Sequence, residues 1–582
     1  MIQSKQEEKR WTVLSNESND SIDKLSEELG VSPFISQLLH QRGVDSFEKA
    51  KTFFRPSLDQ LHDPFMMQDM QAAVDRVEEA LANNQKILVY GDYDVDGTTA
   101  VSLMYSFLKT IHNEVEYYIP DRYTEGYGVS FQGVDYASEN NFQLIIALDC
   151  GIKALDKVAY ATEKGIDFII CDHHRPGDEL PQAVAVLDPK REDCAYPYKE
   201  LCGCGVGFKL VQAIAQTRGI PFDELKPYFD LLAISIASDI VPITGENRVL
   251  AYFGLKLINA NPRQGIKELL ELSASKDREL NITGLVFTVG PRINAAGRMK
   301  SGMNAVKLLV SGDQTDAKEI GLFIERENQD RKDLDRSITE EALEMIAENE
   351  VYLNAKSTVL YQPHWHKGVI GIVASRIIET YYKPTIILTK SNGKAAGSAR
   401  SVSGFDVYEA IDACSDLLTQ FGGHKYAAGL TMPIENIDAF RAKFDEVVSQ
   451  TIPPELLVPE IKIDAEIDLS SIAKKPQAGL PKFYRVLKQF APFGPQNMTP
   501  VFVTRNLKAK WVKVVGETHL KFHAYQEENP SLAFSCIAFG QGDFYDSLMH
   551  GATFEMVYVL EENTWNGSTT LQLNVRDLRV VS

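Results

Sequence analysis

Residues 86–97 read KILVYGDYDVDG, a run of apolar residues that leads directly into three aspartates. A continuous apolar run, without polar residues at alternate positions, is typical of a strand buried on both faces of a parallel sheet. Segments with helical periodicity separate most of the later runs, which are VEYYIP (115–120), LIIALD (144–149), DFIICD (167–172) and AVAVLD (183–188). Strands that alternate with helices predict βαβ units, and hence a parallel sheet covered on both faces.

Ionisable residues end three of these predicted strands, and a further aspartate ends the apolar segment LLAISIASDIVP (231–242). In chain order they are Asp92, Asp94, Asp96, Asp149, Asp172, His173, His174 and Asp239. Because ligands bind at the carboxyl ends of strands in an open parallel sheet, we expect these side chains to converge on one site. A single aspartate at a strand end is more often a helix cap, and Asp172 is a candidate for that role. Only the clusters together indicate a site.

The predicted cluster has the chemistry of a divalent-cation site. If the segment DYDVD stays extended, Asp94 and Asp96 face the same way and can serve two neighbouring cations. Carboxylates at close range raise each other's pKa, and divalent cations remove that penalty. Oxygen ligands with one or two imidazoles and no thiolate favour Mn²⁺ or Mg²⁺ over a structural zinc. Two such ions roughly 3.5–4 Å apart activate a water molecule for in-line attack on phosphorus.

The chain has 582 residues, which at roughly 150 per domain predicts about four folded units. Residues 1–80 read as helices, and residues 81–312 hold the predicted parallel sheet and its acidic cluster. Residues 313–350 are strongly charged with one apolar stripe, which predicts a long solvent-exposed helix joining two lobes. Residues 351–455 predict a smaller α/β domain. Residues 456–582 are rich in short alternating segments, which predict a small β-barrel or sandwich.

The motifs around these residues resemble those of the DHH phosphoesterase superfamily. GDYDVDG (91–97), LDCG (148–151), CDHH (171–174) and SDIVP (238–242) resemble its successive motifs, and GGHKYAAG (422–429) resembles the glycine-rich motif of the associated DHHA1 domain. Nearly the whole chain, including VGPRINAAGRM (289–299) and APFGPQN (491–497), resembles the RecJ family of single-stranded-DNA-specific exonucleases. The resemblance implies a multidomain α/β fold with a parallel-sheet DHH domain, a connecting helix, a DHHA1 domain and a C-terminal barrel of the oligonucleotide-binding (OB) type.

The resemblance implies two ions per active site, Mn²⁺ or Mg²⁺, held by Asp94, Asp96, Asp149, His173 and Asp239. Asp149 would bridge both ions, Asp94 would bind one, and the remaining ligands would bind the other. His174 would contact the scissile phosphate, so the implied catalytic set is Asp96, Asp149, His173 and His174. Asp92 receives no ion in this assignment and would orient the loop.

Glycine-rich turns beside serine and arginine mark the second lobe as a phosphate-binding region, because they expose backbone N–H groups. The turns lie in HWHKGVIGIVASR (364–376), GSARS (397–401) and GGHKYAAG. The resemblance implies that a 5′ phosphate binds Arg122, Arg298, Ser398 and Arg400, and that Gly422, Gly423 and His424 face the metal site across a cleft. Arg376 is a further substrate-binding candidate, with the solvated face of a helix as the alternative. For GGHKYAAG alone, the alternative is a turn at the start of a helix with a buried histidine.

The last domain resembles an OB fold, which combines a basic groove with aromatic side chains on which bases stack. Basic residues alternate with aromatic ones in this region. They are Arg505, Lys508, Lys510, Lys513 and Lys521, with Trp511, Phe522 and Tyr525. Core packing accounts for some of these aromatic side chains, whereas lysines at alternate positions indicate a surface.

The residues and the resemblance together predict a two-metal phosphodiesterase that removes mononucleotides from single-stranded DNA. The metal chemistry follows from the residues, whereas the substrate, the 5′-to-3′ direction and a role in DNA repair and recombination follow from the resemblance. A pyrophosphatase, or a phosphodiesterase for short oligonucleotides or cyclic dinucleotides, is one alternative, although it needs only the two lobes. A non-catalytic DNA-binding scaffold is another, although such relatives lose metal ligands and every ligand position is filled here.

The net charge of −20 at first argues against a nucleic-acid partner, because such proteins usually present a basic surface. The charge is unevenly distributed. Residues 288–308, 361–404 and 501–525 together carry +13, which leaves −33 on the other 492 residues. We therefore expect the DNA strand to follow these three basic segments, while an acidic exterior discourages indiscriminate binding to duplex.

Several features bear on the compartment and the partners. The start, MIQSKQEEKRW, lacks the apolar core of a signal peptide, and the longest apolar stretches fall far short of the ~20 residues that span a bilayer. The seven cysteines are sparse, and Cys202 and Cys204 are not spaced as a CxxC pair. We expect a cytoplasmic monomer without disulfides or membrane contact. The resemblance adds a single-stranded-DNA-binding protein and a RecQ-type helicase as candidate partners.

Overall fold

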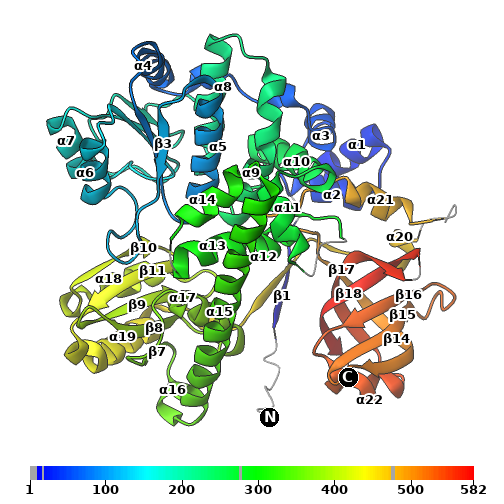
Figure 1. The fold of residues 1–582 in the computed structure, drawn as a ribbon. Coiled ribbons are helices and arrows are strands. Elements are labelled where there is room, and N and C mark those ends of the chain that lie inside the picture. The colour runs from blue at the N-terminus through cyan, green and yellow to red at the C-terminus, as the bar shows by residue number, and fades with distance from the viewer. Residues whose placement is uncertain are drawn as a thin grey trace. The chain divides into compact units, whose positions relative to one another are not determined.

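The structure is a computed structural model that describes residues 9–15, 19–273, 278–299, 301–473, 479–565 and 567–581. The chain forms two compact units. The parallel-sheet unit comprises Arg42–Gln329 and Lys488–Thr499, and the barrel unit comprises Met1–Gln41, Asp330–Leu487 and Pro500–Ser582. The predicted connecting helix is α15 (Gln314–Ala347), which is the long green helix in Figure 1 and continues from one unit into the other.

The first unit contains a five-stranded sheet in which all strands are parallel, as expected. Its order is β3–β2–β4–β5–β6, with β2 (Ile87–Gly91), β3 (Val115–Tyr118), β4 (Leu144–Leu148), β5 (Asp167–Cys171) and β6 (Ala185–Leu187). Alternate residues of β2 enter different cores: Ile87 and Val89 pack on one face, Leu88 and Tyr90 on the other. The continuous apolar runs therefore reflect burial on both faces.

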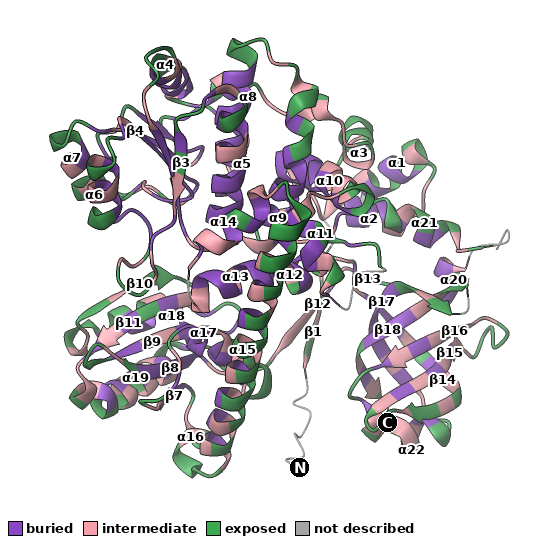
Figure 2. Ribbon diagram, viewed as in Figure 1, coloured by how far each residue is buried: buried purple, intermediate pink, exposed green. Residues whose placement is uncertain are grey.

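Helices cover both faces of this sheet (Figure 2). One core contains side chains from α4 (Met70–Ala82), α5 (Val95–Ile111), α8 (Gly203–Thr217) and α9 (Phe229–Ser238), and the other contains side chains from α6 (Phe131–Glu139) and α7 (Leu155–Glu163). The remaining α-helices of this unit are α3 (Phe47–Phe54), α10 (Gly245–Ala260), α11 (Gln264–Glu271), α12 (Ile282–Thr288), α13 (Gly290–Met299) and α14 (Met303–Val310).

The strand order places a topological switch point between β2 and β4. The chain passes from β2 to β3 on one side, and the later strands β4, β5 and β6 extend the sheet on the other side. The carboxyl ends of β2 and β4 lie on either side of this point, where open α/β sheets form their ligand crevices. Asp92 and Asp149 directly follow these two strands.

The second unit contains the smaller α/β domain predicted for residues 351–455. Its sheet order is β10–β11–β9–β8–β7, with β7 (Thr358–Tyr361), β8 (Thr385–Ser391), β9 (Lys394–Arg400), β10 (Gln420–His424) and β11 (Ala427–Met432). The β7–β8 pair is parallel and the other pairs are antiparallel. The helices of this part are α16 (Glu350–Asn354), α17 (Ile370–Thr380), α18 (Val407–Asp412) and α19 (Ile437–Thr451).

The C-terminal β-structure is a closed barrel and not a sandwich. It contains β14 (Phe502–Val515), β15 (His519–Gln526), β16 (Ala533–Ala538), β17 (Phe554–Trp565) and β18 (Ser568–Val580). Closure follows because β14 pairs with both β15 and β17. The short elements around it are β13 (Ala465–Glu466), α20 (Leu469–Ile472), α21 (Lys482–Lys488) and α22 (Tyr545–Met549).

The N-terminal segment contains helices α1 (Asn19–Leu29) and α2 (Pro33–His40), but its described residues also include a strand that the helical expectation missed. Strand β1 (Arg10–Val13) pairs in parallel with β12 (Glu460–Ile463), and Trp11 Nε1 donates to Asp577 Oδ2 at 2.6 Å. Four residues carry no usable periodicity, so only the distant partner strand makes this segment extended.

The described residues include the cysteines and the most apolar helices of the chain. All seven cysteines lie among these residues, and each is a buried free thiol. Within the same residues, no helix combines the length and the apolar character needed to cross a membrane.

Candidate metal centre and substrate-binding residues

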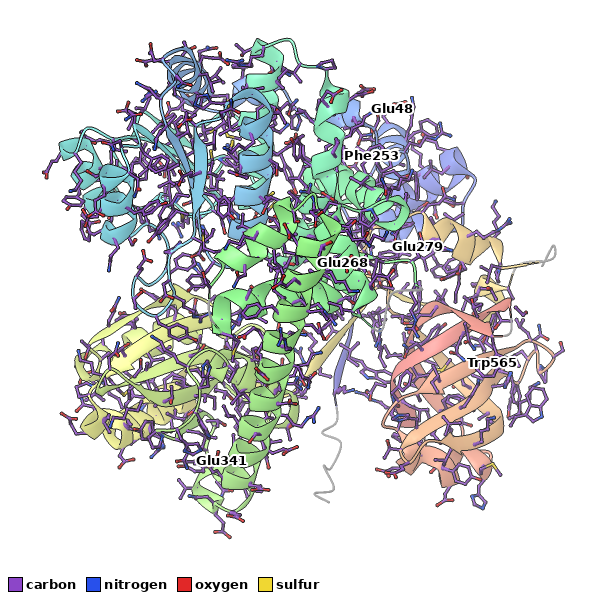
Figure 3. The ribbon with its side chains drawn as sticks, viewed as in Figure 1. Glu48, Phe253, Glu268, Glu279, Glu341 and Trp565 are labelled. Atoms are coloured by element: carbon purple, nitrogen blue, oxygen red, sulfur yellow. The ribbon has the colours of Figure 1, made fainter. Side chains whose placement is uncertain are left out.

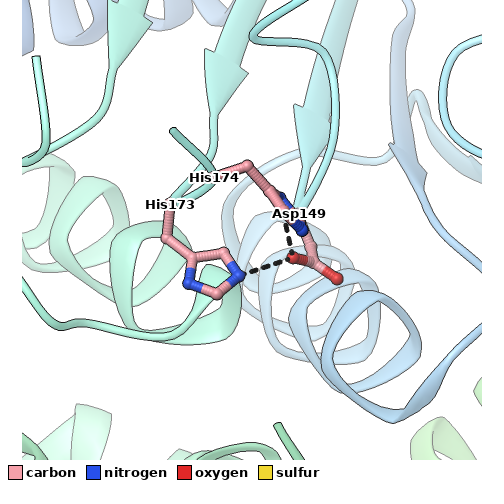
Figure 4. A group of neighbouring side chains, drawn as sticks. All are labelled: Asp149, His173 and His174. Carbon is pink, nitrogen blue, oxygen red and sulfur yellow. Dashed lines mark ion pairs between the residues drawn. The ribbon is translucent and has the colours of Figure 1, made fainter. Parts of the chain in front are cut away.

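Asp149, His173 and His174 meet at the carboxyl edge of the parallel sheet (Figure 4). Asp149 follows β4 with a left-handed backbone, φ 58°, and its side chain is almost completely buried. Its Oδ1 lies 3.2 Å from His173 Nε2 and 3.9 Å from His174 Nδ1. These three residues therefore form one potential cation-binding group, and it lies beside the switch point.

A second potential group shares His173 with the first. His173 Nε2 lies 3.5 Å from Asp239 Oδ2 and 3.8 Å from Asp96 Oδ2. Asp239 caps the C-terminus of α9, and Asp96 lies in the first turn of α5. Asp96 and Asp239, which are about 140 positions apart in the sequence, thus both lie next to the His173 imidazole.

The start of α8 holds the carboxylate of Asp96 in place. Asp96 Oδ2 accepts from the backbone N–H of Gly203 at 2.6 Å, and Oδ1 accepts from the N–H of Cys204 at 2.8 Å and from Ser235 Oγ at 2.6 Å. Gly203 also packs against Asp149, because a Cβ at Gly203 would lie only 2.6 Å from Asp149 Cβ. A glycine at the start of α8 therefore positions two of the expected ligands.

The first acidic motif does not remain extended. Helix α5 begins at Val95, and Asp94 caps it by accepting from the Gly97 N–H at 3.0 Å. Asp94 and Asp96 consequently do not share one face of a strand, which corrects that expectation. Asp94 lies outside the two groups, although its charge raises the pKa of Asp149 and Asp239.

Electrostatics and hydrogen bonding both indicate that these residues suit divalent cations. Burial and neighbouring carboxylates raise the pKa of Asp94, Asp149 and Asp239. Among the described residues, no hydrogen-bond partner is found for the buried atoms Asp149 Oδ1, Asp239 Oδ2, His173 Nδ1 and His173 Nε2. Buried polar atoms without partners are costly, and a cation bound by oxygen and imidazole ligands would satisfy them.

Asp172 orients the two histidines and does not cap a helix. Its Oδ1 accepts from the backbone N–H groups of His173 and His174 and from His174 Nδ1, the last at 2.7 Å, and its Oδ2 accepts from the Ile152 N–H. These hydrogen bonds and the nearby histidine charges outweigh burial and lower the pKa of Asp172 to about 2. Burial opposes the charged form of His174, but its hydrogen bond to Asp172 and the negative charge of that carboxylate raise the pKa of His174 to about 9.

Asp92 contacts the loop that carries Tyr127, a residue that lies outside the sequence motifs. Asp92 Oδ1 accepts from the Gly128 N–H at 3.4 Å, so Asp92 contacts this loop. Tyr127 lies between Gly126 and Gly128, which have φ of 93° and 76°, and its ring centroid is 6.4 Å from that of His174. The only sequence signal for this tyrosine was the flanking pair of glycines.

Arg122 and Arg298 approach the same tyrosine of the parallel-sheet unit. The Arg122 guanidinium lies 5.2 Å from the ring centroid of Tyr93. Burial raises the pKa of the Tyr93 phenol to about 12, and the nearby positive charges of Arg122 and Arg298 oppose that shift. Helix α13, which carries Arg298, packs closely here, since a Cβ at Gly297 would lie 2.5 Å from the Tyr93 carbonyl oxygen. The structure therefore brings together these two expected phosphate ligands.

Ser398 and Arg400 are neighbours on β9 in the barrel unit. Arg400 Nη1 donates to Ser398 Oγ at 3.1 Å, and both side chains lie against the start of α17. A Cβ at Gly371 would lie 2.9 Å from Ser398 Oγ and from Arg400 Nη2. Arg376, on the same helix, instead pairs with the buried carboxylate of Asp335 on α15 at 2.9 Å.

The motif GGHKYAAG forms a β-hairpin and not the start of a helix. Gly422 pairs with Gly429, Gly423 with Ala428, and His424 with Ala427. Gly422, Gly423 and His424 are all exposed, so the buried-histidine alternative is wrong.

The barrel presents one basic aromatic surface. Trp511 is 70% exposed and has φ of 54°, where the β14–β15 register shifts. Lys510 Nζ lies 5.0 Å from its ring centroid and 5.2 Å from that of Tyr525, and His523 packs edge-on against the indole. Phe522 is fully buried in the barrel, so it cannot be a surface stacking residue.

Three family models match the chain. They are the DHH family N-terminal domain at residues 86–236, the DHHA1 domain at residues 354–450 and the RecJ OB domain at residues 463–577. The first match covers the parallel sheet with α5, α8 and most of α9. The other two cover the smaller α/β domain and the barrel.

The chain is similar to curated proteins and to solved structures that are named RecJ. The chain is 36% identical to the single-stranded-DNA-specific exonuclease RecJ of Bacillus subtilis, over 98% of this chain and 71% of that protein. It is 32% identical to RecJ of Dickeya dadantii, over 94% and 95% of the two chains. The crystal structure of RecJ in complex with Mn²⁺ from Thermus thermophilus matches with a TM-score of 0.83 and 28% identity, over 98% of this chain and 80% of that chain. The corresponding structure with Mg²⁺ has a TM-score of 0.77.

Proposed function

Because the chain belongs to the RecJ family of single-stranded-DNA-specific exonucleases, we propose that it hydrolyses single-stranded DNA from the 5′ end and releases 5′-mononucleotides. The observation that carries this proposal is the convergence of buried, unpartnered oxygen and nitrogen atoms of Asp149, His173 and Asp239 among the described residues. A metal-dependent phosphodiesterase needs such a site for divalent cations, whereas a binding scaffold does not.

We assign Asp94, Asp96, Asp149, His173 and Asp239 as the residues that would hold Mn²⁺ or Mg²⁺. When bound, these cations supply positive charge that neutralises the carboxylates and polarises the phosphodiester. The protein holds its ligands in advance, because α8 fixes Asp96 and Gly203 limits the movement of Asp149. His174 donates Nδ1–H to Asp172, so its Nε2 is the ring atom left to contact the scissile phosphate.

We assign the 5′ phosphate to Arg122, Arg298, Ser398 and Arg400, with the exposed Gly422, Gly423 and His424 beside the strand. The pairing of Ser398 with Arg400 and the approach of Arg122 and Arg298 to Tyr93 support this assignment. Arginine suits a terminal phosphate because its donors can bind two oxygens together. Arg376 is the weakest member of the set, because its guanidinium already binds Asp335.

The family membership also supports a place for the protein in cytoplasmic DNA repair and recombination. A single-stranded-DNA-binding protein and a RecQ-type helicase fit this setting, since one covers and the other produces the proposed substrate. A phosphodiesterase limited to dinucleotides would have no use for the barrel.

The function is tested by digesting 5′-labelled oligonucleotides in the presence of Mn²⁺. We expect the label to appear first as a mononucleotide from single strands, with blunt duplex resistant and with 5′-hydroxyl ends cut more slowly than 5′-phosphate ends. Faster turnover of dinucleotides than of long strands would favour the short-substrate alternative. Equal digestion of duplex, or release of the label only in the last products, would contradict the proposal.

Trp511 on the barrel is expected to stack on a base of the strand. Stacking on an aromatic side chain contributes about 1–3 kcal/mol per base, so we expect Trp511→Ala to weaken binding of a single-stranded oligonucleotide roughly 5- to 150-fold. Fluorescence anisotropy with metal-free protein measures this affinity without cleavage.

Trp565→Ala provides a matched control for Trp511→Ala. Trp565 is 75% exposed and lies at the end of β17 on the outside of the barrel (Figure 3), close to the hydrogen-bonded pair Thr564 and Thr569. We expect its loss to leave the affinity unchanged. Equal losses from both substitutions would show that the surface around Lys510 and Tyr525 has no special role.

A further inference from the structure

The segment Lys488–Thr499, which we call the strap, belongs to the parallel-sheet unit, although the chain on both sides of it belongs to the barrel unit. It contains the motif APFGPQN (491–497), which neither the cation ligands nor the phosphate-binding residues explain. Its contacts with the parallel-sheet unit lead to the loop that carries Asp239.

A buried arginine of α10 holds the first half of the strap. The guanidinium of Arg248 lies 4.0 Å from the ring centroid of Phe53 and is largely inaccessible to solvent. It donates to backbone carbonyl oxygens of the strap at 2.8–3.4 Å, namely those of Gln489, Phe490, Ala491 and Pro492. Such a group of acceptors fits the fork of an arginine and would be poorly matched by other side chains.

Asn497 closes the strap on itself. Its Nδ2 donates to the carbonyl oxygens of Phe490 and Pro492 at 2.8 Å each, and its Oδ1 accepts from Arg42 Nε at 2.9 Å. Asn497 is almost completely buried, so these hydrogen bonds have no competition from solvent. The strap is therefore a compact, internally bonded turn.

The strap then contacts the loop between α9 and α10. The backbone N–H of Ile243 donates to the Pro495 carbonyl at 2.8 Å, and Gly494 packs so tightly that a Cβ there would lie 2.5 Å from Ile243 Cγ1. From the start of α10, Asn247 Nδ2 donates to the Pro242 carbonyl at 3.1 Å. The loop is thus held a few residues after the cation ligand Asp239.

This loop contains a strained residue directly beside that ligand. Ile240 has φ of 59° and a side chain that is 66% exposed. A β-branched residue rarely adopts this left-handed conformation, and such strain persists only where the surrounding structure imposes it. Packing of the exposed Ile240 side chain cannot impose this backbone conformation. The hydrogen bonds that hold Pro242 and Ile243 can impose it.

We propose that the strap is a positioning element for the metal centre: by holding Ile243, it forces the strained turn at Ile240 that directs Asp239 toward His173. The carboxylate of Asp239 lies 3.5 Å from His173 Nε2 in this arrangement. The proposal rests on the cation-binding role of Asp239. Without the strap, the turn relaxes and the ligand moves out of the cluster.

The proposal is tested by Mn²⁺ binding to metal-free full-length protein, measured by electron paramagnetic resonance and calorimetry. Residues that orient metal ligands typically change metal affinity roughly 10- to 100-fold when replaced, and we expect this loss for Gly494→Ala and for Arg248→Lys. Saturating Mn²⁺ should restore kcat, and the KM for DNA should not change. Ile240→Gly in the Gly494→Ala background should recover Mn²⁺ affinity, because glycine adopts the turn without strain.

Arg76→Met is the matched control. Arg76 is equally buried, but its guanidinium donates to Asp167 and Gln85 at the amino edge of the same sheet. We expect its loss to lower thermal stability and to leave Mn²⁺ affinity unchanged. Wild-type Mn²⁺ affinity in folded Gly494→Ala and Arg248→Lys, or an equal loss in Arg76→Met, would overturn the proposal. If Asp239→Asn itself leaves the affinity unchanged, the cation assignment fails instead.

Discussion

Asp149→Asn is expected to lower kcat roughly 10³-fold or more, about 4 kcal/mol of barrier, while making the metal-free protein more resistant to heat. Asp149 is buried at the centre of the cluster, and its Oδ1 has no hydrogen-bond partner among the described residues. The asparagine keeps the shape but removes the negative charge that binds cations.

The gain in stability has the same origin as the loss of activity. Burial and the charges of Asp96, Asp94 and Asp239 raise the pKa of Asp149, which means that its ionised form is disfavoured when no cation is present. An amide removes this repulsion, and a large domain gains roughly 2–4 °C in melting temperature for each kcal/mol. Mn²⁺ should raise the melting temperature of the wild type and leave the variant almost unchanged.

Asp188→Asn is the appropriate control for this experiment. Asp188 is fully buried and directly follows β6 on the same edge of the sheet, but it lies outside both cation-binding groups. Its variant should keep the Mn²⁺-induced rise in melting temperature. A destabilised metal-free Asp149→Asn protein, or one that Mn²⁺ still stabilises, would refute the assigned centre.

Lys209→Met is expected to destabilise the parallel-sheet unit by about 3–5 kcal/mol, because it leaves a buried carboxylate without its cation. Lys209 Nζ lies 2.7 Å from Glu246 Oε1, and both side chains are fully buried. Lys209 also donates to the His62 carbonyl and to Gln212 Oε1, so no water is needed to complete its bonding. The pair connects α8, whose start holds Asp96, to α10, which follows the Asp239 loop.

Hydrogen exchange over α8 and α10 measures this loss locally, without assuming that the two units unfold together. We expect protection to fall roughly 100-fold or more, as a change of about 3 kcal/mol requires. The double variant with Glu246→Gln should recover much of the protection, since the amide oxygen can accept from the His62 N–H in place of Oε1 and the amide NH2 can donate to the Tyr196 hydroxyl, which now donates to Oε2. Equal loss in the single and double variants would contradict an uncompensated charge as the cause.

The first acidic motif and the strand before it differ in how far their local sequence specifies their structure. Apolar runs predicted the strands correctly, because burial on both faces leaves a local pattern that needs no knowledge of the rest of the chain. The prediction that Asp94 and Asp96 lie on the same face of an extended segment was wrong. Aspartate suits a helix cap as well as a metal site, and Asp94 caps α5. The barrel shows the same limit: alternation predicted strands, but it did not indicate that Phe522 is buried or that Trp511 is exposed where the β14–β15 register shifts.

The sequence by itself determined that this protein has a parallel sheet whose strands end in carboxylates and imidazoles, and its motifs indicated the family. Only the tertiary structure decided which of these side chains are held by other parts of the chain. Gly203 packs against Asp149, Asp172 accepts a hydrogen bond from His174, and the strap bonds to the loop that follows Asp239. The physical reason is that periodicity is a property of neighbouring residues, whereas burial and hydrogen bonding at this centre join residues far apart in the chain. Such contacts leave no local pattern, so they appear only when the chain is folded.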